Sequence, residues 1–205
     1  MTTRDFIMDQ IQKSVDTKNA ILADAELIDR IDKTAGIITS AYRAGNKTLL
    51  AGNGGSAADA QHIAGELVNR FYFDRPSIAA IALTTDTSVL TAIGNDYGFD
   101  RLFSRQIQAQ GVAGDVFVGI STSGNSENII HAFIVCKEKG IVSVGLTGGK
   151  QSKMDELCDI CIKVPSLETP RIQESHILIG HIICCIVEEN LFGSMNPKNK
   201  QEWKS

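Results

Sequence analysis

The fold is decided by residues 116–139, which read VFVGISTSGNSENIIHAFIVCKEK. They begin as a short apolar run, pass through a loop of small polar residues, and continue with the spacing of an amphipathic helix. A strand that is apolar without alternation is typical of a parallel sheet covered by helices on both faces. The stretch therefore predicts one strand–loop–helix unit of an α/β fold.

The same alternation extends over most of the chain, which has 205 residues. Apolar runs predict strands at residues 48–51, 78–83, 116–120, 142–146 and 160–164. Helical patterns lie near residues 57–72, 99–110, 127–139, 152–157 and 170–192. We therefore expect a doubly wound five-stranded parallel sheet of the flavodoxin-like type, in three αβα layers. With strand order 2-1-3-4-5, the loops after the first and third strands would flank the ligand-binding crevice.

A helical arm precedes the sheet. Ile7, Ile11 and Val15 recur at four-residue steps, and the helical pattern continues to about residue 45. We expect residues 1–45 to form assembly helices and residues 46–195 to form the ligand-binding domain, the two acting as a single functional unit.

The last helix is apolar nearly all round between Ile177 and Val187. A helix of this kind is buried on more than one side. Packing against a second copy of the chain is the simplest cover, so we expect a homo-oligomer.

Composition excludes several classes of protein. Apolar residues make up 43% of the chain and charged residues 21%, which excludes a disordered chain and provides a core. The net charge of −4 argues against a nucleic-acid partner held by bulk electrostatics. On the sequence alone, no apolar stretch approaches the ~18–20 residues that span a bilayer, and the N-terminus lacks the features of a signal peptide. We therefore expect a cytoplasmic protein with no membrane partner.

The five cysteines fit that compartment, because an odd count without framework spacing argues against a disulfide scaffold. Cys158 and Cys161 have CxxC spacing, but no second pair completes a four-thiolate zinc site. We expect both to be buried thiols.

The loop after the first predicted strand reads GNGGSA over residues 52–57 and leads into a helix. Glycines let backbone amides approach a ligand, and the N-terminus of the following helix favours an anion. The spacing is neither a dinucleotide fingerprint nor a P-loop. Taken alone the loop is weak evidence, since many such turns bind nothing.

The loop after the third predicted strand is richer in chemistry. Ser121, Thr122, Ser123 and Ser126 place four hydroxyls in six residues at the start of a helix. Together they could donate several hydrogen bonds to phosphate oxygens without adding positive charge. The alternative is that Ser126 simply caps the helix. One cap does not need four hydroxyls, so we favour phosphate binding.

In this fold, the Ser-Thr-Ser-Gly-Asn-Ser loop resembles the phosphosugar-binding signature of the sugar isomerase (SIS) domain family. The GNGGSA loop, His62, Glu66, Asn95-Asp96 and residues 171–174 (RIQE) narrow the resemblance to members that isomerise phosphorylated heptoses. It extends over essentially the whole chain. It implies conversion of sedoheptulose 7-phosphate to D-glycero-D-manno-heptose 7-phosphate, the first step towards nucleotide-activated heptose for surface glycans such as lipopolysaccharide. It also implies a homotetramer with active sites at subunit boundaries.

A metal site is expected on the helix after the first loop. His62 and Glu66 are four residues apart and share one face, and an imidazole with a carboxylate suits zinc. The alternative is an ordinary hydrogen-bonded helix pair. The resemblance implies Gln173 and His181 as the other two ligands of one zinc ion per subunit. Periodicity alone would not propose this pair, because eight residues span about 12 Å of one helix.

The implied isomerisation moves a proton between C1 and C2 through an enediol, which needs a base, an acid and stabilisation of the developing oxyanion. We assign Glu66 as the general base and His181 as its acid–base partner, with zinc polarising the sugar oxygens. The expected substrate contacts are Asn53, Gly54, Gly55, Glu66, Asn95, Asp96, Ser121, Thr122, Ser123, Ser126 and Gln173. Asn95-Asp96 could instead form a plain turn. Thr169 lies where some relatives carry an acidic residue. We expect His176 to be structural or interfacial.

Two other classes of function share these motifs: binding proteins, which include sugar-phosphate sensors, and other isomerases. One is a non-catalytic SIS-domain binding protein that associates with the replication initiator; such relatives lack the acid–base pair that Glu66 and His181 provide here. A sugar-phosphate sensor would need a DNA-binding module, for which there is no spare length. The other is an isomerase of a hexose or pentose phosphate, which would not explain the four proposed metal ligands together.

Overall fold

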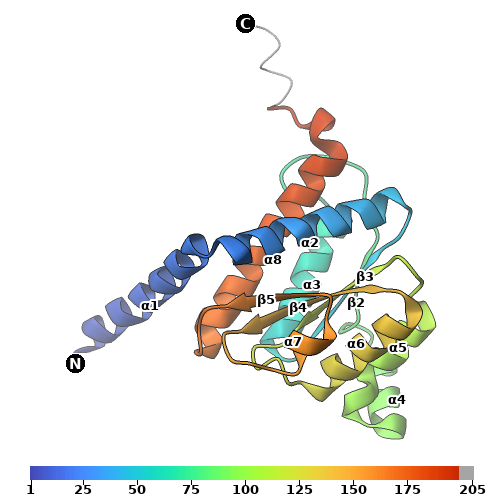
Figure 1. The fold of residues 1–205 in the computed structure, drawn as a ribbon, viewed down its shortest axis with the longest axis horizontal. Coiled ribbons are helices and arrows are strands. Elements are labelled where there is room, and N and C mark those ends of the chain that lie inside the picture. The colour runs from blue at the N-terminus through green and yellow to red at the C-terminus, as the bar shows by residue number, and fades with distance from the viewer. Residues whose placement is uncertain (199–205) are drawn as a thin grey trace, which may run out of the picture.

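The computed structural model describes residues 1–198, in which helices cover both faces of one parallel sheet (Figure 1). All strand pairs are parallel and the strand order is β2-β1-β3-β4-β5. The strands are β1 (Thr48–Gly52), β2 (Ala80–Ala82), β3 (Val116–Ile120), β4 (Val142–Gly148) and β5 (Ile160–Val164). The predicted fold class is confirmed, and so is the order of the strands. The order reverses between β1 and β3, so the two loops singled out in the sequence flank the crevice.

Helices pack on both faces of the sheet, and the first of them extends beyond it. They are α1 (Thr3–Ala23), α2 (Ala25–Arg43), α3 (Gly55–Val68), α4 (Thr87–Tyr97), α5 (Leu102–Gln110), α6 (Glu127–Lys139), α7 (Met154–Leu157) and α8 (Thr169–Phe192). Successive strand residues face opposite layers: Leu50 packs with the core side chains of α2, α3 and α8, whereas Leu49 packs with those of α5, α6 and α7. Both leucines are fully buried, as expected for a strand covered on both faces.

One helix was not predicted. Helix α4 has no fully buried residue, and its apolar positions Leu90 and Ile93 only partly pack against the core. With four β-branched residues and Gly94 it has low intrinsic helix propensity, and it begins at Asp86, whose carboxylate accepts the backbone N–H of Val89. The strand predicted at residues 78–83 is correspondingly shorter, and the helix predicted from residue 99 begins with a 3₁₀ turn at Phe99–Arg101.

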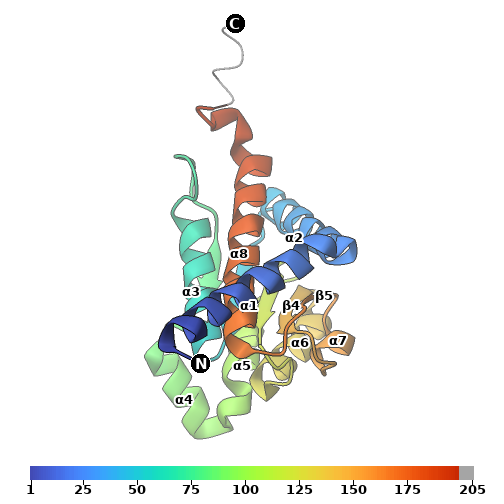
Figure 2. The same cartoon turned by 90° about the vertical axis from the view of Figure 1, so that its left-hand side faces the viewer.

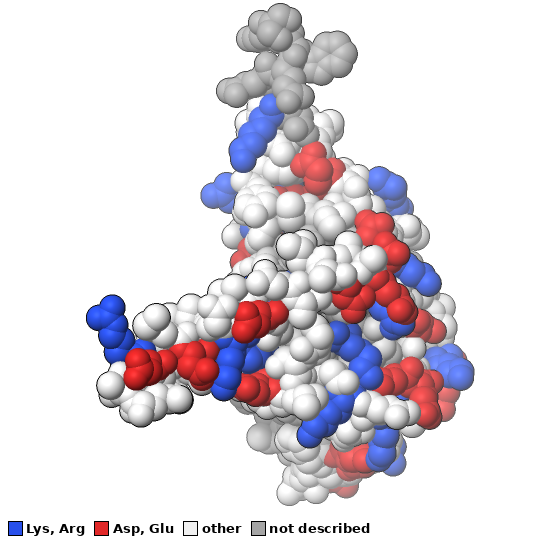
Figure 3. All heavy atoms as spheres, turned by 60° about the vertical axis from the view of Figure 1, so that its left-hand side comes forward, with Lys and Arg blue, Asp and Glu red and all other residues white. Residues whose placement is uncertain are grey.

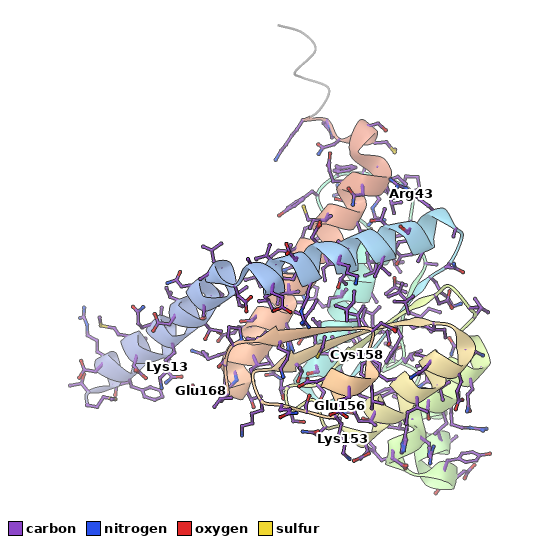
Figure 4. All side chains as sticks on the ribbon, viewed as in Figure 1. Lys13, Arg43, Lys153, Glu156, Cys158 and Glu168 are labelled. Carbon is purple, nitrogen blue, oxygen red and sulfur yellow. The ribbon has the colours of Figure 1, made fainter. Side chains whose placement is uncertain are left out.

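Helix α1 extends away from the sheet as an arm (Figures 1 and 2). It meets the body near the start of α8, where Ser14 donates to Glu174 at 2.7 Å and Lys13 lies 3.6 Å from Glu168. Lys13 and Glu168 are labelled in Figure 4. Phe6 and Ile11 are more than half exposed. The arm therefore presents apolar side chains that this single chain does not cover.

Among residues 1–198, one helical stretch, Thr169–Met195, is long and apolar enough to cross a membrane by length and composition. This corrects the expectation that no stretch reaches that length. Its buried apolar residues, which include Ile179 and Val187, belong to the core shared with α2 and α3, and a core helix passes the same test. About 33% of its apolar window is buried within the chain, so much of α8 faces outward.

Candidate active site

The two loops at the crevice are joined by a pair of side-chain amides. Asn53, in the loop after β1, donates to Asn128 at 2.9 Å, and Asn128 donates back to Asn53 at 2.9 Å. Asn128 lies in the first turn of α6 and is buried. A reciprocal amide pair satisfies one donor and one acceptor on each side chain and fixes the loops in one arrangement. No local sequence pattern indicates Asn128, because its partner lies 75 residues away.

Three of the four hydroxyls in the second loop converge on one another. The Ser121 hydroxyl lies 2.9 Å from that of Ser126 and 3.4 Å from that of Ser123. Ser126 occupies the N-cap position of α6, but its hydroxyl makes no capping hydrogen bond, so the alternative of a simple cap is wrong. Gly124 has φ +65°, and a Cβ there would collide with the Ser152 side chain, so only glycine suits the turn. The loop thus joins a cluster of hydroxyls to the N-terminus of a helix, a combination suited to phosphate.

A cleft of about 320 Å³ opens beside this loop. That volume lies within the range of small-molecule sites. Thr122, Ser123 and Thr169 line it, and so does Lys150 from the loop after β4. Lys150 adds a cation that no motif in the sequence indicates. The cleft can therefore accept an anionic group next to the hydroxyls.

Helices α3 and α8 lie side by side and run in the same direction (Figures 1 and 2). A Cβ on Gly55 would collide with the Gln173 amide, and a Cβ on Gly180 would lie 2.6 Å from Ile63 Cδ1, so both glycines allow close approach. This packing places His62 of α3 directly opposite His181 of α8.

The structure brings His62, Glu66 and His181 together. His62 Nε2 lies 3.1 Å from Glu66 Oε1 and 3.3 Å from His181 Nε2. In the described chain these are the one group of three His, Cys, Asp or Glu residues whose ligand atoms lie within 4.8 Å of one another. Zinc ligands at about 2.0–2.1 Å in tetrahedral geometry are about 3.3 Å apart, so the spacing and the N/O donors fit such an ion. The alternative of an isolated His62–Glu66 pair does not account for His181.

Gln173 lies at the first crevice loop, and Asn95 and Asp96 lie at the end of α4. Gln173 contacts Gly55, and the eight residues between it and His181 correspond to about 12 Å along α8. Its role as a fourth ligand stays a prediction. Asn95 and Asp96 lie exposed in the last turns of α4 rather than in a plain turn, and Asn95 donates to Asp96 at 2.8 Å.

The remaining candidate side chains are structural. His176 is fully buried, with Nε2 3.2 Å from the Thr147 carbonyl oxygen, and burial lowers its pKa to about 4. Cys158 is a partly buried free thiol and Cys161 a buried one. Acidic and basic side chains are interspersed over the face shown in Figure 3, with no basic stripe that would indicate nucleic acid.

Comparison with known proteins defines the class of this site. The SIS domain family model matches residues 14–148. The chain is 67% identical to the phosphoheptose isomerase of Aneurinibacillus thermoaerophilus (92% of this chain, 95% of the relative) and 66% identical to phosphoheptose isomerase 2 of Campylobacter jejuni (92% and 94%). The structure of a phosphoheptose isomerase from Francisella tularensis superposes with a TM-score of 0.88 at 38% identity, covering 92% of this chain and all of that one. The chain therefore belongs to the SIS domain family and, within it, to the phosphoheptose isomerases.

Proposed function

We propose that the protein interconverts sedoheptulose 7-phosphate and D-glycero-D-manno-heptose 7-phosphate, as an early step of activated heptose synthesis. The observation that carries this is the meeting of His62 and Glu66, on the helix that begins at the first crevice loop, with His181 on α8. From Gly55 to His62 α3 rises about 10 Å. That is comparable to the length of an extended seven-carbon sugar phosphate, so one substrate can reach both the loops and the cluster.

In the ketose-to-aldose direction, Glu66 removes a proton from C1 and the electron pair forms the C1–C2 double bond of an enediolate. The proton is then returned to C2, while His181 moves the hydroxyl proton from O1 to O2. Glu66 Oε1 faces His62, which leaves Oε2 for the proton transfer. Zinc, one ion per subunit, would polarise the sugar oxygens as a Lewis acid, held by His62, Glu66 and His181 with Gln173 as fourth ligand.

The substrate phosphate is assigned to the hydroxyl loop. Ser121, Thr122, Ser123 and Ser126 would bind its oxygens, supported by the N–H groups that begin α6. The sugar hydroxyls are assigned to the first loop and to the end of α4. The residues proposed for these contacts are Asn53, Gly54, Gly55, Asn95, Asp96 and Gln173. Thr169 lines the cleft where some relatives carry an acid, and we assign it an orienting contact with the sugar.

The protein is proposed to act as a homotetramer in the cytoplasm. The exposed apolar side chains of α1 and the outward face of α8 support this, because contact with other subunits would cover them. His181 lies on α8, so the site would stand at a subunit boundary. Light scattering tests the proposal: an active species near 22.2 kDa would contradict it, and one near four times that mass would support it.

The direct test of function is incubation of the purified protein with sedoheptulose 7-phosphate in D₂O, followed by NMR. We expect the aldose to form and deuterium to enter at the transferred position. A non-catalytic binding protein would perturb the substrate signals without turnover, and that outcome would contradict an isomerase. The presence of both Glu66 and His181 in one cluster favours the enzyme.

A further inference from the structure

A buried ion pair lies next to the metal-binding cluster without belonging to it. Glu188 on α8 and Arg75 in the loop after α3 are each 1% exposed, with Arg75 Nε 3.0 Å from Glu188 Oε1. Glu188 also accepts the backbone N–H groups of Phe71 and Tyr72, each at 2.7 Å. One carboxylate on α8 therefore holds three donors of the loop at residues 69–79.

The other end of Arg75 holds helix α3. Its Nη2 donates to the carbonyl oxygen of Glu66 at 2.9 Å, and its Nη1 donates to that of Leu67 at 2.8 Å. The last carbonyl groups of a helix lack partners within the helix, and a cation at that end is favourable. Arg75 thus satisfies the end of α3 at Glu66, whose side chain belongs to the cluster.

The same ion pair is connected in two ways to His181, the third residue of the cluster. Glu188 follows His181 by seven residues, which is two turns, so both lie on one face of α8. Phe71, whose N–H Glu188 holds, packs its ring 5.5 Å from the His181 ring. The pair therefore connects Glu66 on α3, the loop, and His181 on α8 through contacts that are all buried or partly buried.

We infer that Arg75 and Glu188 are positioning residues, which hold Glu66 and His62 of α3 at metal-binding distance from His181 of α8. This inference rests on the proposed function, since it concerns the same cluster. A buried ion pair contributes little net stability compared with apolar residues of the same size, whereas removing one partner is costly. The ion pair instead fixes the geometry between α3 and α8. Neither side chain touches the ligand atoms, so both act through the backbone and the Phe71 ring.

The alternative is that the pair only secures the loop, and the chain contains a matched control for that role. Asp115 is also fully buried, and it also accepts two backbone N–H groups and one cation: those of Lys47 and Val112 at 3.0 and 2.9 Å, and Lys47 Nζ at 2.6 Å. It lies at the amino ends of β1 and β3, on segments that carry no cluster residue. Glu188→Gln and Asp115→Asn therefore remove the same kind of interaction at two places.

The experiment compares these two variants of the full chain by chelator competition for zinc, by thermal unfolding, and by kcat and KM. Both amides leave a backbone N–H without its acceptor, so both should unfold at lower temperature. Glu188→Gln should bind zinc at least about tenfold more weakly and lose kcat more than it raises KM, as for other residues that orient metal ligands. Asp115→Asn should keep the zinc affinity of the wild type.

Arg75→Lys provides a second variant should Glu188→Gln fail to fold. It keeps the charge beside Glu188 but cannot hold both carbonyl groups of α3, so the same loss of zinc affinity is expected. Equal zinc affinity in the Glu188, Arg75 and Asp115 variants would overturn the inference, as would a wild-type protein that binds no zinc. A wild type that binds zinc tightly but does not isomerise the heptose phosphate would instead refute the proposed function, and the zinc comparison would still decide the positioning role.

Discussion

Ser121→Ala tests the phosphate site most directly, because Ser121 stands at the centre of the hydroxyl cluster. Its hydroxyl contacts those of Ser126 and Ser123, and the residue is only 4% exposed. A hydrogen bond to a charged group contributes about 1.5–3 kcal/mol. One lost bond to the phosphate should therefore weaken substrate binding by roughly 10- to 150-fold, since about 1.4 kcal/mol corresponds to a factor of ten.

The assay measures the dissociation constant of the sugar phosphate and, separately, the rise in melting temperature that inorganic phosphate produces. A ligand that binds the folded state stabilises it in proportion to the logarithm of its concentration over its dissociation constant. In Ser121→Ala, both the affinity for the sugar phosphate and the phosphate-induced rise in melting temperature should decrease, while kcat at saturation should change less. Ser104→Ala is the matched control, because Ser104 on α5 is 3% exposed and its hydroxyl donates to the carbonyl oxygen of Arg101, away from the crevice loops.

A Ser121→Ala protein with the affinity of the wild type for both ligands would refute the phosphate assignment. Equal weakening in Ser104→Ala would also refute it, since the effect would then reflect loss of a buried hydroxyl in general.

Three further predictions concern the histidines and Glu66. Because burial lowers the pKa of His176 to about 4 from 6.5, the unfolded chain takes up this proton first, so about 3 kcal/mol of stability should be lost as the pH falls from 6.5 to 4. His176→Gln should remove that part of the pH dependence in denaturant unfolding; an unchanged profile would contradict it. Chelation should abolish turnover and zinc restore it, and His62→Ala should bind less metal while keeping its circular dichroism spectrum. Full activity of metal-free protein would exclude the ion from the mechanism. Glu66→Gln should bind substrate but lose ~10²–10⁴-fold in rate and in deuterium exchange, whereas a near-normal rate would place the base elsewhere.

Most of the fold could be predicted because the apolar runs are continuous and the intervening segments have helical spacing. The strand at residues 116–120 and the helix at 127–139 were placed without error. Helix α4 was missed because it buries no residue completely, so it has little of the periodicity on which such predictions depend. Its stability comes from a cap and from neighbouring helices, which local sequence does not reveal.

The site residues also differ in whether local sequence can reveal them. His62 and Glu66 could be found from their four-residue spacing, because both lie on one helix. His181 is 119 residues from His62, and its place in the cluster depends on how α3 and α8 pack. Glu188 likewise meets Arg75 across 113 residues, so no local pattern could indicate the contact.

The amide pair between the crevice loops also affects the chemical stability of the protein during storage. Asn53 precedes Gly54, and an asparagine followed by glycine is prone to deamidation, because glycine leaves the next backbone nitrogen unhindered to attack the side-chain carbonyl. While Asn53 exchanges hydrogen bonds with Asn128, its carboxamide is held away from that reaction. Once deamidated, it would lose the donated bond and place a negative charge beside the phosphate site. Stored enzyme should therefore lose affinity for its substrate as its mass rises by deamidation, and Asn128→Ala should shorten the storage life.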